Sequence, residues 1–385
     1  MSAVRLGGDR VLTQGALLWG PGEEWSVEEI RLSDPVDHEV TVRIAACGLC
    51  HSEEHFVTGD LPVPHWPILG GHEGSGEIVD VGPGVRRFSV GDRVILSAIP
   101  SCGQCRPCLL GYGAICDEGY RAVSGEALAD NRRRTSARGE EVAPFCNLGA
   151  FAPYVTVHEH SLVKLEKDVP LELAALLGCG VTTGWGAAVN VAEVRAGETV
   201  VVLGLGGVGA AAVLGAVGAG AERVIVVDPV ASKRELALGL GATHFFVNAQ
   251  TATEAVREET WGVMAEKVII TVGRMEGALL QVALEMTSKL GVVVPVSSGD
   301  VTEVDAKLNV TQLRGYLRSV KGVLLGGGSP KRTIARLVDL YAAGQLPLER
   351  LVTARYPLAD INRGYDDMRA GRNLRGLLVF DGADR

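Results

Sequence analysis

Two hydrophobic patterns divide the chain. Up to about residue 180, short stretches of alternating apolar and polar residues are separated by Gly- and Pro-containing turns, after an N-terminal extension with short strands in residues 1–40. Val40–Ile44 alternates with period two, and Glu77–Gly82 and Gly91–Leu96 are read as two further strands. Such alternation is typical of half-buried strands. Many short strands with this punctuation predict an antiparallel, barrel-like module.

A second pattern begins at Glu198, where apolar runs alternate with helical stretches. Thr199–Leu203 is almost wholly apolar, as in a strand of a parallel sheet that is buried on both faces. Lys267–Val272 and Gly291–Val296 are expected to continue this sheet, and Lys321–Leu325 to close it. Strands that alternate with helices predict an α/β fold with a doubly wound parallel sheet.

The C-terminal part is expected to return to the first module. Thr333–Ala343 has apolar residues on one helical face, Ile361–Met368 reads as another helix, and Gly376–Phe380 reads as a strand. We therefore predict one domain made of residues 1–180 and 325–385 and a second, inserted domain of residues 181–324.

A glycine-rich loop in the second module marks a dinucleotide site. The loop Gly204-Leu205-Gly206-Gly207-Val208-Gly209 follows a strand and precedes a helix, and the next strand, Arg223–Val227, ends at Asp228. A lone G-x-G-x-x-G is weak evidence, but it is strong within a complete strand–helix–strand unit. The helix N-terminus favours a pyrophosphate. Asp228 would accept hydrogen bonds from the adenosine ribose and repel a 2′-phosphate, which favours NAD over NADP.

Composition narrows the classes of partner. The chain has 385 residues, of which 47% are hydrophobic and 22% charged, and its formal net charge is −9. An acidic chain gives no reason to expect a nucleic acid or an anionic membrane as partner. The N-terminus has no apolar signal segment, and no run approaches the ~18 apolar residues of a membrane span. We expect a cytoplasmic protein with reduced cysteines.

Residues 118–147 are polar and are predicted to form an irregular loop. Their basic run, Arg132–Arg134 with Arg138, is interpreted as a solvated loop rather than a binding patch, because nucleic-acid readers need a larger basic face. Cys146 belongs to no ligand pattern and is interpreted as a structural thiol.

Four cysteines, Cys102, Cys105, Cys108 and Cys116, lie within 15 residues. Four thiolates can close a tetrahedral zinc site that has no open coordination position, which is the structural kind. Two disulfides or four unrelated buried thiols are the alternatives. Intracellular chains rarely contain disulfides, and unrelated thiols would not be expected at spacings of 3, 3 and 8 residues. We predict a structural-zinc lobe at about residues 97–120.

A second group of residues has the composition of a catalytic metal site. Cys47 and Cys50 are both candidates for a thiolate ligand at a loop-to-helix passage, and His72 follows in Gly71-His72-Glu73-Gly74. Cys179 is the best candidate for a third ligand. A catalytic zinc has three protein ligands and one open position, and two thiolates would neutralise the ion while leaving it a strong Lewis acid.

Taken together, these motifs resemble those of the zinc-dependent alcohol dehydrogenases of the medium-chain dehydrogenase/reductase superfamily, over essentially the full length. The matching segments are Gly48–Ser52, Gly71–Gly74, the four-cysteine lobe, Gly178–Gly186 and Gly204–Gly209. The resemblance implies a GroES-like barrel domain, a Rossmann domain, two zinc ions per chain, NAD(H), and a homodimer or homotetramer.

Within this superfamily the chain is most similar to the NDMA-dependent group. These are nicotinoproteins whose NAD(H) stays bound and is re-oxidised in place by another acceptor, and in bacteria the group is associated with mycofactocin. The likeness includes Thr182–Gly186 and Val227–Val230.

The resemblance also implies roles for the metal-site residues. Cys50, rather than Cys47, would be the thiolate ligand, together with His72 and Cys179. Glu73 would be a nearby carboxylate that approaches the metal during ligand exchange. Glu53 would orient His72, as metal-bound imidazoles require, although the family usually has Asp at this position.

The remaining roles concern the proton, the cofactor and the substrate. Ser52 would take the alcohol proton and pass it, through the nicotinamide ribose, to His55 near solvent. His51 stands in the place of a pyrophosphate contact that is often Arg in relatives. Further positions that match cofactor contacts are Thr183, Lys233, Val296, Ser298 and Arg375. Positions that match the substrate pocket are Leu61, Ala98, Asn147 and Leu324, and Ala98 suggests a roomy pocket because relatives often have an aromatic residue there. The histidines without ligand spacing, to which we assign no role, are His38, His65, His158, His160 and His244.

The predicted reaction is the reversible oxidation of a primary alcohol to an aldehyde with NAD(H). A glutathione-dependent formaldehyde dehydrogenase shares nearly all of these motifs and is an alternative. An inactive zinc-binding structural or regulatory protein on the same fold is an alternative of another class. A site that had lost its activity would not need to keep Ser52 and His55. These two residues could also be ordinary polar neighbours of the metal loop.

Overall fold

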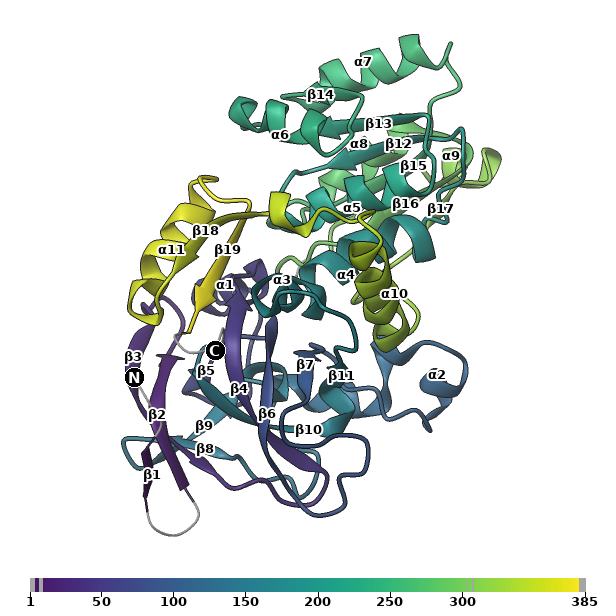
Figure 1. Cartoon of the computed structure of the whole chain (residues 1–385). Helices are drawn as coiled ribbons and strands as arrows, with labels where there is room; N and C mark the ends of the chain where they lie inside the picture. The colour runs from purple at the N-terminus through teal and green to yellow at the C-terminus, as the bar shows by residue number, and fades with distance from the viewer. Residues whose placement is uncertain (1–3, 7–9, 303, 307, 381–385) are drawn as a thin grey trace. The chain divides into compact units, whose positions relative to one another are not determined.

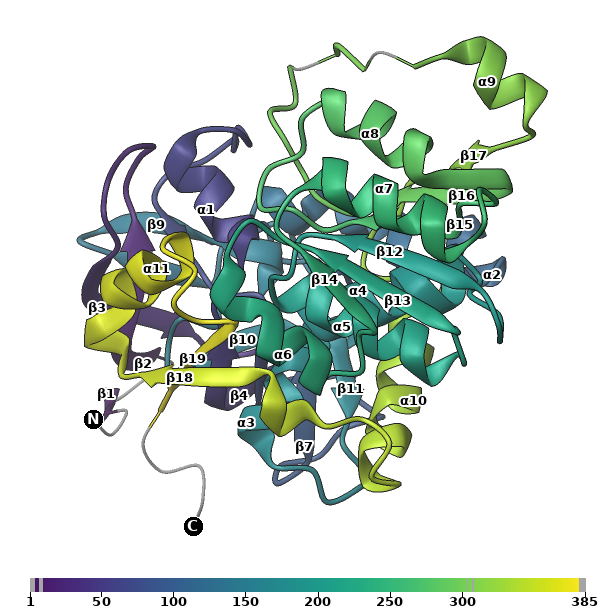
Figure 2. The same cartoon turned by 90° about the horizontal axis from the view of Figure 1, so that it is seen from above.

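The computed structural model describes residues 4–6, 10–302, 304–306 and 308–380, which form two compact units (Figures 1 and 2). The first unit combines the described parts of residues 1–179 and 328–385, and the second comprises those of residues 180–327. The predicted fold class is confirmed, because one unit is mostly antiparallel β structure and the other carries a parallel sheet between helices.

The first unit contains two β-sheets. Their strand orders are β1-β2-β3-β8-β9-β5 and β11-β7-β6-β4-β19-β18, with β10 also beside β4. The strands are β1 Val4–Leu6, β2 Arg10–Leu18, β3 Ser26–Ser33, β4 Glu39–Gly48, β5 Ile68–Leu69, β6 Gly74–Val81, β7 Arg93–Leu96, β8 Thr135–Ala137, β9 Glu140–Pro144, β10 Tyr154–His158, β11 Leu162–Lys164, β18 Val352–Tyr356 and β19 Arg375–Val379. The α-helices of this unit are α1 His51–Thr58, α2 Arg106–Leu109, α3 Leu171–Ala175, α10 Pro330–Ala342 and α11 Ile361–Arg369.

Strand β4 is the centre of the second of these sheets. All but one of its residues are buried, and it pairs antiparallel with β6 along one edge and with β10 and β19 along the other. Since β19 comes from the C-terminal end of the chain, the prediction that this tail rejoins the first module is confirmed. The strand predicted at Val40–Ile44 lies within β4.

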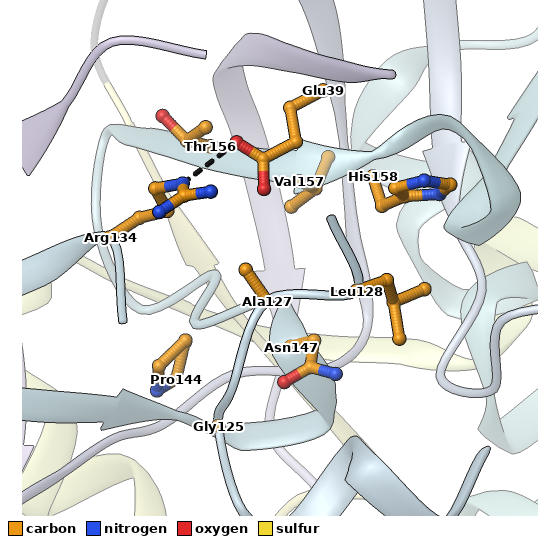
Figure 3. A pocket seen from close by; sticks show the side chains of 10 residues that line it. All are labelled: Glu39, Gly125, Ala127, Leu128, Arg134, Pro144, Asn147, Thr156, Val157 and His158. Atoms are coloured by element: carbon orange, nitrogen blue, oxygen red, sulfur yellow. Dashed lines mark hydrogen bonds and ion pairs between the residues drawn. The ribbon is translucent and has the colours of Figure 1, made fainter. Parts of the chain in front are cut away.

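The prediction for residues 118–147 was wrong. This segment contains the antiparallel pair β8 and β9, and β8 also pairs with β3. Arg134 is not a solvated residue but is 7% exposed, and its Nε donates to Oε2 of the buried Glu39 at 2.8 Å (Figure 3). Arg138 donates two hydrogen bonds to Glu28 on β3. Arg134 is therefore used inside the fold, whereas Arg133 and the exposed Arg138 pair with carboxylates closer to the surface.

The second unit is a six-stranded parallel sheet in the order β14-β13-β12-β15-β16-β17. Its strands are β12 Thr199–Leu203, β13 Arg223–Val227, β14 His244–Phe246, β15 Ala265–Ile270, β16 Thr287–Pro295 and β17 Ser319–Val320. Its α-helices are α4 Gly180–Gly186, α5 Gly207–Gly218, α6 Arg234–Gly239, α7 Ala249–Glu259, α8 Ala278–Met286 and α9 Val310–Gly315.

Side chains from both faces of this sheet are buried. Val201 and Leu203 on β12 pack in one core with Val256 of α7 and Leu284 of α8, whereas α5 contacts β12 and β13 and packs against α4. Helices on both faces explain why these strands read as continuous apolar runs.

The predicted closing strand Lys321–Leu325 was wrong in position. The last strand is β17, Ser319–Val320, which pairs with β16. After it, Lys321 still donates a backbone hydrogen bond to Val293, but Leu324 is exposed and Leu325 has a φ of 45°. A positive φ at a branched residue is incompatible with an extended strand, so the sheet ends earlier than the apolar run.

Among the described residues, no single helix has both the length and the apolar character needed to cross a membrane. One bent pair, Leu171–Gly178 with Gly180–Val191, passes the same test by length and composition alone.

Candidate active site

Cys50, His72, Glu73 and Cys179 form a buried group of potential metal ligands. One ligand atom from each of these residues lies within 4.8 Å of the others. Strand pairing brings the first three together, because Cys47 on β4 lies opposite Gly74 on β6. The chain continues from the end of β4 to Cys50, the N-cap of α1, while His72 and Glu73 immediately precede β6.

Two glycines allow the backbone to pass close to this group of ligands. A Cβ at Gly178 would meet the carbonyl oxygen of Leu96 and the Cα of Glu73, so only glycine lets the chain pass close enough to place Cys179 beside the other ligands. A Cβ at Gly48 would collide with the carboxylate of Glu73. The glycines of the sequence motifs are therefore needed for packing around the ligands.

His72 is oriented by Glu53. Its Nδ1 lies 2.6 Å from Oε1 of Glu53, which also accepts the backbone N–H of Gly71 at 3.1 Å. Glu53 is 0% exposed, and the contact predicted for it is present despite its extra methylene group. Nε2 of His72 is buried and has no hydrogen-bond partner of normal geometry, as expected of a nitrogen that a metal would bind.

The electrostatics of this group fit a divalent cation. Contact with Cys179, which outweighs burial, holds the pKa of Cys50 well below its usual range, and contact with Cys50, together with burial, raises that of Cys179. Burial alone would lower the pKa of His72, but the Glu53 carboxylate and the Cys179 sulfur raise it well above its usual value. Two sulfurs and one imidazole in a buried site suit zinc, which would replace the protons on His72 and Cys179.

Glu73 and Arg375 form a buried ion pair beside these ligands. Arg375 begins β19, so the C-terminal strand brings a cation to the ligand group. The resemblance had implied a cofactor contact for Arg375. Its position against Glu73 shows in addition a local role, since it compensates the charge of a buried carboxylate.

The residues of the predicted proton relay both lie on α1, Ser52 in its first turn and His55 in its last. Ser52 Oγ lies 3.6 Å from Cys50 Sγ. His55 was expected near solvent, and this was wrong, because it is only 6% exposed and its Nδ1 lies 3.2 Å from Oδ2 of Asp60. His51, the first residue of α1, is exposed.

Sequence reasoning missed Phe145. Its ring lies edge-on to His72 with centroids 5.0 Å apart and edge-on to Phe56 at 4.6 Å, so it forms an aromatic wall beside the metal-ligand group. The next residue, Cys146, is buried and has a φ of 56°. Burial raises the pKa of Cys146 to about 12, in keeping with the structural thiol that was predicted.

Asn147, one of the four positions expected in the substrate pocket, lines a cavity of the first unit. This cavity is formed beside the Arg134–Glu39 pair (Figure 3), and both polar atoms of the Asn147 side chain are buried there without a hydrogen-bond partner. The residues that line it are Glu39, Gly125, Ala127, Leu128, Arg134, Pro144, Asn147, Thr156, Val157 and His158. Ala98 is buried next to Cys179, because its N–H donates to the carbonyl of Gly178 at 3.3 Å.

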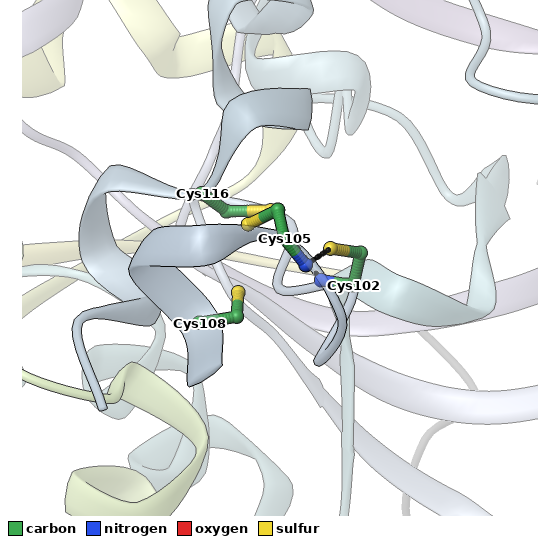
Figure 4. Close-up of side chains that lie close together, drawn as sticks. All are labelled: Cys102, Cys105, Cys108 and Cys116. Atoms are coloured by element: carbon green, nitrogen blue, oxygen red, sulfur yellow. Dashed lines mark hydrogen bonds between the residues drawn. The ribbon is translucent and has the colours of Figure 1, made fainter. Parts of the chain in front are cut away.

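The four cysteines of the predicted lobe lie together, with their sulfur atoms within 4.8 Å of one another (Figure 4). Backbone amides point at the sulfurs, as in Cys105 N–H to Cys102 Sγ at 3.3 Å and Cys102 N–H to Cys116 Sγ at 3.4 Å. A backbone hydrogen bond from Asp117 is the main reason why the pKa of Cys105 falls to about 7. Four thiol ligands, with no further ligand grouped with them among the described residues, suit a closed structural zinc site.

The glycine-rich loop joins β12 to α5 in the second unit. Gly204 has a φ of 97°, and a Cβ at Gly209 would meet the carbonyl oxygen of Gly204. Gly206 is the N-cap of α5, and nothing lies within 4 Å of the position of its missing Cβ. Open space before a helix N-terminus is what an approaching phosphate requires.

Asp228 follows β13 and is buried beside this loop. Its carboxylate accepts hydrogen bonds from the N–H of Leu205 at 2.8 Å, the N–H of Val230 at 2.9 Å and Nζ of Lys233 at 2.9 Å. Asp228 therefore holds the glycine loop as well as carrying the charge expected next to a ribose. Three other positions implied in cofactor binding belong to the same unit, namely Thr183 on α4 and Val296 and Ser298 after β16.

Comparisons with known proteins agree with this geometry. Residues 36–167 match the model of the alcohol dehydrogenase GroES-like domain, and residues 207–343 that of the zinc-binding dehydrogenase family. The chain is 46% identical to alcohol dehydrogenase B of Mycobacterium tuberculosis over 97% of this chain and 100% of that protein. It is 44% identical to the NDMA-dependent alcohol dehydrogenase of Amycolatopsis methanolica over 95% and 98%, respectively. The crystal structure of benzyl alcohol dehydrogenase from Acinetobacter calcoaceticus has a TM-score of 0.88 at 33% identity, with 96% of this chain and 99% of that one covered.

Proposed function

This chain belongs to the zinc-dependent alcohol dehydrogenases of the medium-chain dehydrogenase/reductase superfamily, and from that premise we propose that it oxidises primary alcohols with an NAD(H) that stays bound. An external acceptor would re-oxidise the cofactor in place. Such a protein is an NAD-dependent alcohol dehydrogenase in its chemistry, but its cofactor behaves as a prosthetic group.

The observation that carries this proposal is the 44% identity with an NDMA-dependent alcohol dehydrogenase across nearly both full chains. The glycine loop supports it, because Asp228 holds that loop through the N–H of Leu205. A preorganised loop loses less conformational freedom when it binds a ligand, which favours slow release. The exposed His51, in place of a pyrophosphate-binding Arg, argues in the other direction.

The residues of the ligand group have distinct proposed roles. Cys50, His72 and Cys179 would hold the catalytic metal, with Glu53 keeping Nε2 of His72 turned toward it. Bound zinc supplies a Lewis acid for the alcohol oxygen, and bound NAD⁺ accepts the hydride. Ser52, beside the Cys50 sulfur, would take the hydroxyl proton of the alcohol, and His55 would hold that proton before its release.

The acceptor and the assembly are part of the same proposal. Mycofactocin, or another redox carrier, would take the electrons from the bound cofactor, and the chain would form a homodimer or homotetramer. The substrate would be a primary alcohol. The small Ala98 near Cys179 would leave room for its side group, and the aromatic ring of Phe145 lies beside His72.

Desalted protein tests the proposal directly. We expect NAD(H) to remain with the protein through gel filtration, at about one molecule per chain by absorbance and mass analysis. The desalted protein should oxidise a primary alcohol with NDMA and without added NAD⁺. A protein that elutes without nucleotide and turns over only with free NAD⁺ would contradict the bound-cofactor proposal, while leaving the zinc chemistry intact.

A further inference from the structure

The end of helix α1 folds an acid back onto His55. The helix ends at Thr58, and Gly59 adopts the left-handed conformation with a φ of 79°. A glycine in this conformation reverses the chain after a helix. Asp60 follows directly and therefore lies against the last helical turn, with Oδ2 at 3.2 Å from Nδ1 of His55.

Further contacts hold this arrangement. The hydroxyl of Thr58 donates to Oδ2 of Asp60 at 2.9 Å, and the N–H of Leu61 donates to the carbonyl oxygen of His55 at 3.2 Å. The side chains of His55 and Asp60 are only 8% and 11% exposed. The hydrogen bond between them is thus shielded from water and stronger than it would be at a solvated surface.

We propose that Asp60 is a positioning residue of the alcohol dehydrogenase reaction, acting through His55. An ionised carboxylate can only accept a hydrogen bond, so Nδ1 of His55 must carry the proton that is shared with Asp60. This fixes the tautomer in which Nε2 is the lone-pair nitrogen. Asp60 also stabilises the imidazolium that forms when Nε2 takes a proton, as the acid does in other histidine–carboxylate pairs.

The proton balance follows from this assignment. In alcohol oxidation the hydroxyl proton ends on Nε2 of His55, the carbon-bound hydride goes to NAD⁺, and the aldehyde is released. His55 then loses its extra proton to solvent, while the proton on Nδ1 stays in the bond with Asp60. The inference rests on the proposed role of His55, and it explains why this base can be buried.

A double-mutant cycle tests the pair. Zinc- and NAD(H)-loaded His55→Ala, Asp60→Ala and double variants are compared with the unchanged protein in alcohol oxidation, with NDMA or with free NAD⁺ as required. We expect Asp60→Ala to lower kcat about tenfold with little change in KM, and His55→Ala to lower it about a hundredfold. The double variant should match His55→Ala within about twofold, because Asp60 has nothing left to orient.

Two further variants separate positioning from a structural effect. Asp60→Asn keeps an acceptor oxygen for Nδ1 and should retain a kcat between those of the unchanged protein and Asp60→Ala, even if the alanine variant folds poorly. Asp366→Ala removes an exposed carboxylate on α11 that pairs with Arg369 and should leave kcat unchanged. The solvent deuterium isotope effect on kcat should rise in Asp60→Ala, since proton transfer becomes slower.

The outcomes are distinct. A double variant that is about ten times slower than His55→Ala, or an Asp60→Ala variant with full kcat, would overturn the pair while leaving His55 as the base. If His55→Ala itself kept full kcat, this result would contradict both the proposed proton route and the proposed role of Asp60. Loss of activity in all variants with loss of zinc would instead assign Asp60 a structural role.

Discussion

Cys47 and Cys50 have the same chemistry but different surroundings. Cys47 lies in β4, is fully buried, and its pKa is raised well above the usual value, mainly by burial. Cys50 lies past the end of the strand, where Cys179 lowers its pKa. Among the described residues, the group of potential metal ligands contains Cys50 and not Cys47, so the geometry selects Cys50.

Zinc analysis of two alanine variants tests this selection. Cys50→Ala should lose one of two zinc ions and nearly all activity, because a catalytic zinc has only three protein ligands. Cys47→Ala is the matched control and should keep both ions. An empty catalytic site in Cys47→Ala, together with a full one in Cys50→Ala, would reverse the ligand assignment.

Asp228 couples cofactor choice to loop structure. Asp228→Gly should raise the affinity for NADP relative to NAD, because it removes a negative charge and leaves Lys233 free to meet a 2′-phosphate. A tenfold change in this ratio corresponds to about 1.4 kcal/mol. Asp228→Asn is the control that removes the charge but keeps acceptor capacity for the Leu205 N–H. Equal binding of NAD and NADP by the unchanged protein, measured by calorimetry, would contradict the role of Asp228.

Strand β10 ends at His158, which caps the short helical turn Glu159–Ser161 and has a lowered pKa. Burial is the main cause that lowers the pKa of His158 to about 4, and the nearby His160 lowers it further. Nδ1 of His158 accepts the N–H of His160 at 3.1 Å, which requires an unprotonated nitrogen. The folded state therefore binds this proton less readily than the unfolded state.

The sign of the pH effect follows. Between pH 6.5 and about 4, His158 takes up a proton in the unfolded chain but stays unprotonated in the folded chain. The free energy of unfolding therefore falls as the pH falls through this range. The contribution of His158 is at most about 3 kcal/mol. His158→Asn, which keeps an acceptor for the His160 N–H, should lose less stability between pH 7 and pH 4.5 than the unchanged protein in urea titrations. Parallel pH dependences of the two proteins would show that His158 is not the sensor.

At the scale of the whole molecule, metal is expected to act in two different ways. The four-cysteine lobe is closed and lies apart in sequence from the catalytic ligands, so its zinc contributes to folding rather than to chemistry. Cys105→Ala should therefore lower the melting temperature and the yield of folded protein, whereas Cys50→Ala should lose activity with a smaller change in stability. Elemental analysis should find two zinc ions per unchanged chain. Equal melting temperatures of Cys105→Ala and the unchanged protein would exclude a structural zinc.

Local motifs were predictable because their partners are close in sequence. The four cysteines of the lobe are separated by a few residues, and the glycine loop is flanked by its own strand and helix, so spacing alone revealed their geometry. The doubly wound sheet was predictable for a similar reason, since strands buried on both faces are apolar throughout. The assignment of Glu53 to His72 came from resemblance, and its contact is present.

Other features depended on contacts between distant segments. Arg134 reads as a solvated cation until β8 pairs with β3 and brings it to Glu39, 95 positions away. His55 reads as a surface residue until Gly59 turns Asp60 back onto it. The apolar run Lys321–Leu325 fails to extend the sheet because the backbone turns at Leu325. Spacing and periodicity describe neighbours along the chain, whereas burial and charge compensation are set by long-range packing, and only the tertiary structure could decide them.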